Sequence, residues 1–181
     1  FLSYMTDKKV GWDKKKMADL AYRSEVIEFQ EPGGMMDQYS TAIGNLVYIE
    51  SEPKMHIQKL NSSLESFVLG DSQEPKETLM ILKRCRDIRL ELFNVIRLNN
   101  RKFNLHSSNV RLDLSDLNNE ERALLNATIK NRDILRQAKI ELIKTNPDHQ
   151  LIGSLLNNHH YILRDDLHVS TNKIERMLDA A

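Results

Sequence analysis

The chain has 181 residues, of which 40% are hydrophobic, enough to bury the core of one domain or of a piece of a larger one. Its 26 basic and 26 acidic residues cancel, and no long basic stripe is present, which argues against a nucleic-acid partner. No apolar run approaches the roughly 20 residues that span a bilayer. We therefore expect no membrane partner. The single cysteine, Cys85, permits no internal disulfide, so we expect a cytoplasmic protein.

The first predicted element is a helix over residues 13–31, because its apolar residues recur at helical spacing and Asp13 is suited to cap it. The glycine pair Gly33-Gly34, preceded by a proline, should end this helix. A short helical turn is expected from Asp37 onward.

Three apolar stretches then read as strands, over residues 45–50, 55–60 and 66–69, the last leading into a turn at 70–72. The first third of the chain is therefore expected to be mixed α/β.

Helical spacing dominates the remainder, with helices predicted over 75–98 and 118–144, after Asp148, and from Ser170 or Thr171. The polar residues 99–113 are the best linker candidate, and no internal repeat is found. On the helix 118–144, the residues expected to face inward are Leu124, Leu125, Ile129, Leu135, Ala138 and Leu142.

The stretch from Glu31 to Tyr39, Glu-Pro-Gly-Gly-Met-Met-Asp-Gln-Tyr, holds the best candidate for chemistry. Its two glycines let the backbone approach a ligand, and Asp37 follows at a helix start, where a carboxylate is favoured. Local chemistry leaves two interpretations open. Asp37 is either a catalytic base or simply the N-cap of the helix.

Three segments resemble galactokinases, which are sugar kinases of the GHMP superfamily. Residues 31–44 are similar to the segment in which glycine, two apolar residues and Asp-Gln precede a short helix. Residues 163–170, Leu-Arg-Asp-Asp-Leu-His-Val-Ser, resemble a second family segment that leads into a helix. Residues 21–25 resemble the family's helix whose glutamate lies 12 positions before the aspartate, as Glu25 precedes Asp37.

The resemblance implies an ATP-dependent kinase that phosphorylates a sugar hydroxyl, at C1, with ATP and Mg²⁺ as cofactors of the complete protein. It makes Asp37 the catalytic residue that faces the hydroxyl, Glu25 the metal ligand, and Gly34 a second sugar-binding residue. Phosphoryl transfer needs such charge neutralisation and an aligned nucleophile. Three further residues of the matching segments form a second tier of site residues: Gln38, His160 and Asp165.

The match is weak between residues 51 and 163, and the glycine-rich phosphate loops and the sugar-recognition segment of the family are not among the 181 residues. Where galactokinases have a tyrosine, this chain has Glu74-Pro75. We therefore expect an inactive fragment, cut at both ends, that by itself binds neither nucleotide nor metal.

The implied fold is α+β, a GHMP-type fragment with an incomplete N-terminal sheet layer followed by a mainly helical part. Residues 1–73 would be the remnant of the N-terminal catalytic domain, and residues 74–181 a fragment of the helical C-terminal domain. The exposed edges of such a truncated sheet would favour self-association.

Two alternatives stay open. A heptose-phosphate kinase or another GHMP small-molecule kinase fits the Gly-Gly-x-x-Asp-Gln-Tyr pattern nearly as well. A different class is a non-catalytic helical interaction module in which Asp37 only caps a helix. The adjacent pair His159-His160 is expected to serve packing or the surface, since neighbouring side chains on a helix diverge and lack a partner at metal-ligand spacing.

Overall fold

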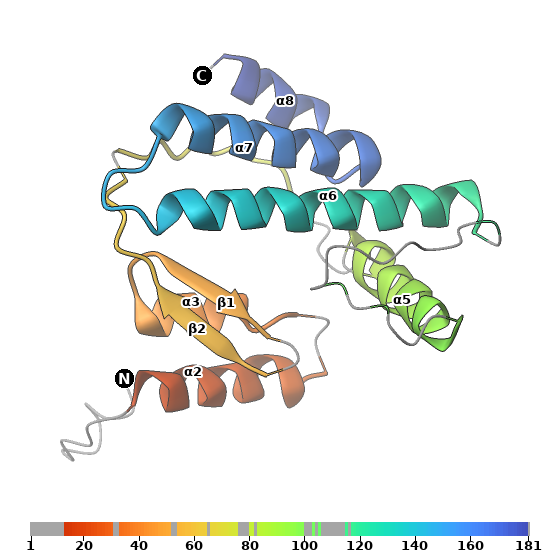
Figure 1. Ribbon diagram of the computed structural model, residues 1–181, viewed down its shortest axis with the longest axis horizontal. Coiled ribbons are helices and arrows are strands. Elements are labelled where there is room, and N and C mark those ends of the chain that lie inside the picture. The colour runs from red at the N-terminus through yellow and green to blue at the C-terminus, as the bar shows by residue number, and fades with distance from the viewer. Residues whose placement is uncertain are drawn as a thin grey trace. The chain divides into compact units, whose positions relative to one another are not determined.

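The computed structural model describes residues 13–30, 33–51, 54–64, 66–75, 80–81, 83–99, 103, 105, 115 and 117–180. The fold is α+β and mostly helical, as predicted, with six helices and one two-stranded antiparallel sheet in the described residues (Figure 1). The chain forms two compact units, residues 1–61 and residues 62–181.

The first helix of the N-terminal unit, α2 (Lys14–Tyr22), begins as predicted, because Asp13 accepts a hydrogen bond from the backbone N–H of Lys15 at 3.2 Å. It continues into a π-helical segment, η1 (Arg23–Ile27), whose wide turn is closed by the N–H of Glu28 donating to the carbonyl of Arg23 at 2.9 Å. The helical segment ends at Ile27 and residues 28–30 form a turn, so the helix predicted over 13–31 ends earlier than predicted, before the glycine pair.

The second helix, α3 (Met36–Ile43), contains Asp37 in its first turn. The alternative interpretation of Asp37 as the N-cap is wrong, because the N-cap is Met35, two positions earlier, with no capping side-chain bond. Asp37 instead lies inside the turn, where the positive end of the helix dipole favours its negative charge. The helix ends at Gly44, whose φ of 74° lies in the region that favours glycine.

The two strands β1 (Val47–Glu50) and β2 (His56–Lys59) confirm two of the three predicted strands. They pair in antiparallel register with Ile49 opposite Ile57, so both side chains lie on one face. That face packs on a small core contributed by the two helices. Its buried members are Ala18, Tyr39 and Ile43, and Val47, Ile49 and Ile57 pack against them.

The third predicted strand, residues 66–69, is wrong. These residues are described, but they pair with no strand in the described part of the chain. Phe67, Val68 and Leu69 are 80%, 95% and 98% exposed, so a short apolar run occurs here without the burial that normally makes it a strand.

This segment belongs to the helical unit. The hydroxyl of Ser62 donates to the carbonyls of Leu142 and Lys144, the latter at 2.9 Å. A Cβ placed on Gly70 would lie 2.9 Å from the sulfur of Met177. The two compact units therefore divide between Asn61 and Ser62, whereas the sequence predicts the boundary at residues 73 and 74.

The predicted helix over 75–98 is present where it is described, as η2 (Lys83–Asp87) and α5 (Ile88–Asn99). Residues 76–79 and most of the predicted linker 99–113 lie outside the described residues. Cys85 is partly buried in η2.

The longest helix, α6 (Asn119–Leu142), starts with a capping box, in which Asn118 and Glu121 each accept a hydrogen bond from the other's backbone N–H at 2.9 Å. The next helix, α7 (His149–Tyr161), is capped by Asp148 and runs antiparallel to α6 (Figure 1). Both predicted starts are confirmed.

The core of the helical unit forms where α5 meets α6. Leu125 is only 1% exposed, and the rings of Phe93 and Phe103 lie 5.7 Å apart between centroids. Leu135 was expected to face inward but is 52% exposed, because this far along α6 its face has left the contact with α5. The buried members of the core are Leu92, Phe93, Ile96, Phe103, Leu124 and Leu125.

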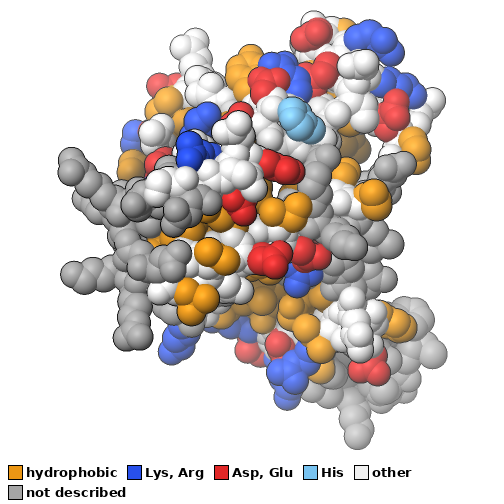
Figure 2. All heavy atoms as spheres, turned by 90° about the vertical axis from the view of Figure 1, so that its right-hand side faces the viewer, with side chains coloured by type: hydrophobic (Ala, Val, Ile, Leu, Met, Phe, Trp, Pro, Cys, Tyr) orange, Lys and Arg blue, Asp and Glu red, His pale blue; other side chains and the backbone are white. Residues whose placement is uncertain are grey.

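After α7 the chain continues through another π-helical segment, η3 (Ile162–Asp166). It is followed by the helix α8 (Asn172–Asp179), whose N-cap is Thr171 as predicted. Within the described residues, none of the helices combines the length and apolar character needed to cross a membrane. On the face drawn in Figure 2, hydrophobic side chains lie at several separate places among charged ones.

Candidate functional site

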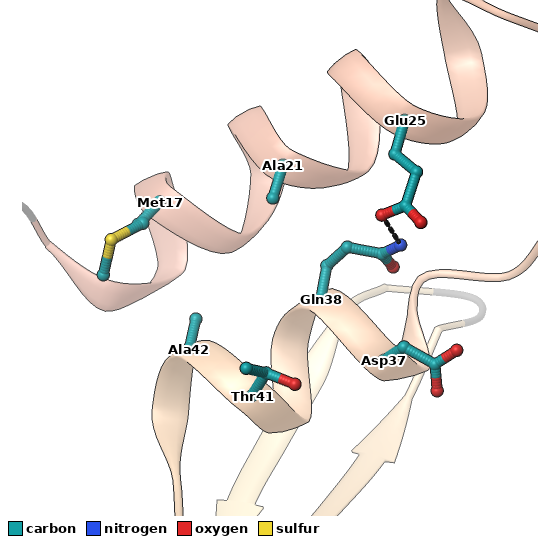
Figure 3. A pocket seen from close by; sticks show the side chains of 7 residues that line it. All are labelled: Met17, Ala21, Glu25, Asp37, Gln38, Thr41 and Ala42. Atoms are coloured by element: carbon teal, nitrogen blue, oxygen red, sulfur yellow. Dashed lines mark hydrogen bonds between the residues drawn. The ribbon is translucent and has the colours of Figure 1, made fainter. Parts of the chain in front are cut away.

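The N-terminal unit contains an open pocket of about 490 Å³ at the crossing of α2 and η1 with α3 (Figure 3). Glu25 reaches it from η1, and Asp37 and Gln38 reach it from the first turn of α3. The structure thus brings together three of the residues that the sequence singles out. The other lining residues are Met17, Ala21, Thr41 and Ala42.

Local sequence explains how the pocket forms. Met17, Ala21 and Glu25 follow one another at intervals of four, which places them along one side of the helix. Ala21 and Ala42 face the pocket with the smallest side chains that a regular helix favours, so the two helices approach each other without filling the space. Lys14 links the helices at their other end by donating to the carbonyl of Ile43 at 2.9 Å.

Gln38 connects the two sides of the pocket. Its side-chain amide donates to one carboxylate oxygen of Glu25, with 2.7 Å between Nε2 and Oε2 (Figure 3). Its other amide atom, Oε1, is buried and has no hydrogen-bond partner. Asp37 is exposed, and its carboxylate turns away from Glu25 in Figure 3.

The two glycines before α3, Gly33 and Gly34, differ in their surroundings. Gly34, predicted to bind sugar, is exposed and is not among the residues that line this pocket. Gly33 is the position where closeness matters, because a Cβ there would lie 3.2 Å from a methyl carbon of Val26 in η1. The absence of a side chain at Gly33 lets the turn pack on the segment that carries Glu25.

The remaining two predicted residues, His160 and Asp165, lie in the helical unit, in a group we call the polar cluster: His160, Arg164, Asp165, Ser170 and Glu175. Glu175 is its centre, with Oε1 2.9 Å from Nε2 of His160 and Oε2 3.2 Å from Nη1 of Arg164. Ser170 also donates to Glu175. Asp165 pairs with the guanidinium of Arg164 through two bonds, of 2.7 and 3.0 Å.

These contacts favour the charged forms of Glu175, Asp165 and Arg164. The hydrogen bond from Ser170 lowers the pKa of Glu175, with further lowering by Arg164 and His160. The hydrogen bond from Arg164 lowers the pKa of Asp165, and in turn Asp165 and then Glu175 raise the pKa of Arg164. The cluster therefore fastens α8 to the end of α7. Sequence spacing gave no signal for Glu175, which lies 15 residues after His160.

The described residues were also compared with the requirements of a metal site. Within the described residues, no three or more His, Cys, Asp or Glu side chains gather as a metal site would require. His160 is engaged with Glu175, and burial, followed by the neighbouring His160, lowers the pKa of His159. Both histidines are partly buried, and their predicted service in packing or at the surface stays a prediction.

Comparison with known proteins adds no relative. No family model, no curated protein and no solved structure matches the chain. The functional assignment therefore rests on the pocket residues themselves.

Proposed function

We propose that this chain carries the sugar-facing part of the active site of an ATP-dependent sugar kinase similar to galactokinase. The observation that supports the proposal is that Glu25 and Asp37 line one pocket, although one residue lies in η1 and the other in α3. A pocket of about 490 Å³ is within the range that holds small molecules.

In this proposal Asp37 accepts a hydrogen bond from the sugar hydroxyl and orients its oxygen toward the γ-phosphate. The first turn of α3 suits that role, because the positive end of the helix dipole favours a negative charge there. The hydroxyl proton passes to Asp37 as the new O–P bond forms and the bond to the β-phosphate oxygen breaks.

Glu25 is the residue proposed to hold Mg²⁺. The ion would neutralise charge that develops on the phosphates. Mg²⁺ commonly keeps several waters and takes one or two carboxylates along with substrate phosphates, so a single carboxylate fits as one ligand but does not make a site alone. Titration calorimetry of the 181-residue chain with MgCl₂ should accordingly show no tight site.

Nucleotide binding requires several backbone N–H groups gathered around a phosphate. The six glycines of this chain, at 11, 33, 34, 44, 70 and 153, form no such loop. The proposal therefore assigns the nucleotide contacts to segments outside these 181 residues. Equilibrium dialysis should find no sub-millimolar ATP binding to the chain, and saturable micromolar binding would contradict the assignment.

The decisive experiment is phosphorylation of a sugar panel by the full-length protein, with galactose, other free sugars and a heptose phosphate as acceptors. Asp37→Asn should abolish phosphate transfer because it removes the proton acceptor while keeping the shape. Asp13→Asn is the matched control, since Asp13 serves as a helix cap at the far end of α2. Equal loss in both variants would reject the role of Asp37.

A specific observation also favours a second candidate, an interaction module. Phe67, Val68 and Leu69 form a consecutive apolar run that is at least 80% exposed, and such runs commonly mark contact surfaces. This alternative predicts no phosphate transfer to any acceptor and no effect of Asp37→Asn on partner binding.

A further inference from the structure

The orientation of the Gln38 amide is the starting point. A glutamine has two acceptor lone pairs and two donor hydrogens, and in a buried setting both ends normally find partners. Here Nε2 is engaged with Glu25 at 2.7 Å, while Oε1 is buried without a partner. Burying an acceptor without a partner is unfavourable, so the packing around Gln38 costs the hydrogen bond that Oε1 would make in water.

The contact that remains is the one with a charged acceptor. A hydrogen bond to a carboxylate is about twice as strong as one between neutral groups. A flipped amide would direct an oxygen at the negatively charged Glu25 side chain, so the carboxylate itself fixes which end faces it. Gln38 is also half-buried on α3, whereas Glu25 is exposed on η1, and the better anchored side chain therefore restrains the freer one.

From this geometry we infer that Gln38 is a positioning residue, which holds the Glu25 carboxylate in one orientation within the pocket. The inference rests on the proposed function for its catalytic meaning. It deepens that function by explaining how a side chain on an exposed π-helical turn keeps the fixed direction that a metal ligand requires. The restraint itself is a property of the chain without any ligand.

Nuclear magnetic resonance of the 181-residue chain tests the restraint without sugar or nucleotide. Three-bond couplings across the Cα–Cβ bond of Glu25 should have the values of one staggered rotamer. Gln38→Met keeps the length and most of the volume but removes the donor, and should move these couplings to the average of several rotamers. Gln58→Met, the same change on strand β2, should leave them unchanged.

The Gln38 side-chain amide gives a second signal. Its proton bonded to Glu25 should resonate downfield of the Gln58 amide protons, and Glu25→Ala should remove that difference. Averaged Glu25 couplings in the unmodified chain, or couplings unaffected by Gln38→Met, would overturn the inference, because a residue that only fills space is replaced well by methionine.

Kinetics of the full-length protein separate this inference from the proposed function. If both hold, Gln38→Met should raise the Mg²⁺ concentration needed for half-maximal rate about ten- to a hundredfold, with little change in the sugar KM. Rigid Glu25 couplings together with no phosphate transfer to any sugar would leave the positioning role intact and reject the kinase. Transfer that is lost in Asp37→Asn but needs the same Mg²⁺ concentration in Gln38→Met would reject the positioning role in catalysis.

Discussion

Truncation of Leu125 should be among the most destabilising single changes in the helical unit. The side chain is 1% exposed and lies in the core between α5 and α6. Leu125→Ala removes buried methyl groups and leaves a cavity, and comparable core truncations cost about 2–5 kcal/mol. With the neighbouring aromatic pair of Phe93 and Phe103 resisting collapse into the space, we expect about 3 kcal/mol.

Leu135→Ala on the same helix is the matched control, because Leu135 is 52% exposed and alanine and leucine have similar helix propensity. Its cost should be about 1 kcal/mol or less. Urea unfolding followed by far-ultraviolet circular dichroism measures the stability of both variants. With a slope of about 2 kcal/mol per molar urea, the midpoint should fall by about 1.5 M in Leu125→Ala and by at most about 0.5 M in Leu135→Ala. Equal shifts would refute this account of the core.

Three further changes test other parts of the structure. Glu175→Gln should increase amide hydrogen exchange in α8 (Asn172–Asp179) but not in α6, because the charge at the centre of the polar cluster is lost. The same carboxylate makes the attachment of α8 pH-dependent, because the pKa of Glu175 is lower in the folded state than in the unfolded state. Its contribution to stability is therefore complete above about pH 4.3 and is lost as the pH falls through the folded pKa. Hydrogen exchange of α8 at pH 7 and pH 3 would reveal the loss. Gly70→Ala should have little effect on exchange in α8, because the added methyl would meet only the end of the flexible Met177 side chain, which can move aside; a large increase in exchange would contradict this account. Gly44→Ala should cost about 1–3 kcal/mol in thermal melts of the chain, since φ of 74° and ψ of 168° suit only glycine and no neighbour lies within 4 Å to add a clash.

Helix boundaries were the part of the fold that sequence predicted best. Asp13, Asn118, Asp148 and Thr171 all lie at the starts of helices in the structure, because capping depends on a side chain and the backbone within three residues of it. The sequence around each cap therefore contains all the information needed to predict it.

Which face of a helix is buried was predicted less well. Leu124 and Leu135 lie about three turns apart on the same side of α6, yet one is 8% exposed and the other 52%, since burial depends on where α5 ends along α6. The prediction of a strand at 66–69 was wrong because it also depends on a partner elsewhere in the fold. A strand needs a neighbouring strand to pair with, and the apolar residues of one segment do not show whether such a neighbour exists.

For the candidate site, the resemblance singled out Glu25, Asp37 and Gln38, which line one pocket, but it could not give the Gln38 bond to Glu25, because no spacing rule covers two side chains 13 residues apart in different helices. It also could not anticipate Glu175, whose partners come together only when α8 folds back on the end of α7. The GHMP-type fold and the kinase activity stay predictions.

The wide turn η1 has a consequence for how this helix tolerates changes in length. A π-helical turn holds one residue more than a regular turn, so it is equivalent to an α-helix with a single inserted residue. Deleting Ser24, whose hydroxyl already bonds to the carbonyl of Leu20 four residues earlier, would let α2 continue as a regular helix. Because the wide turn absorbs the extra residue, the side chains that follow η1 would keep their direction relative to α2 after the deletion. A one-residue deletion within η1 should thus be tolerated, whereas the same deletion inside α2 would turn every later side chain by about 100°.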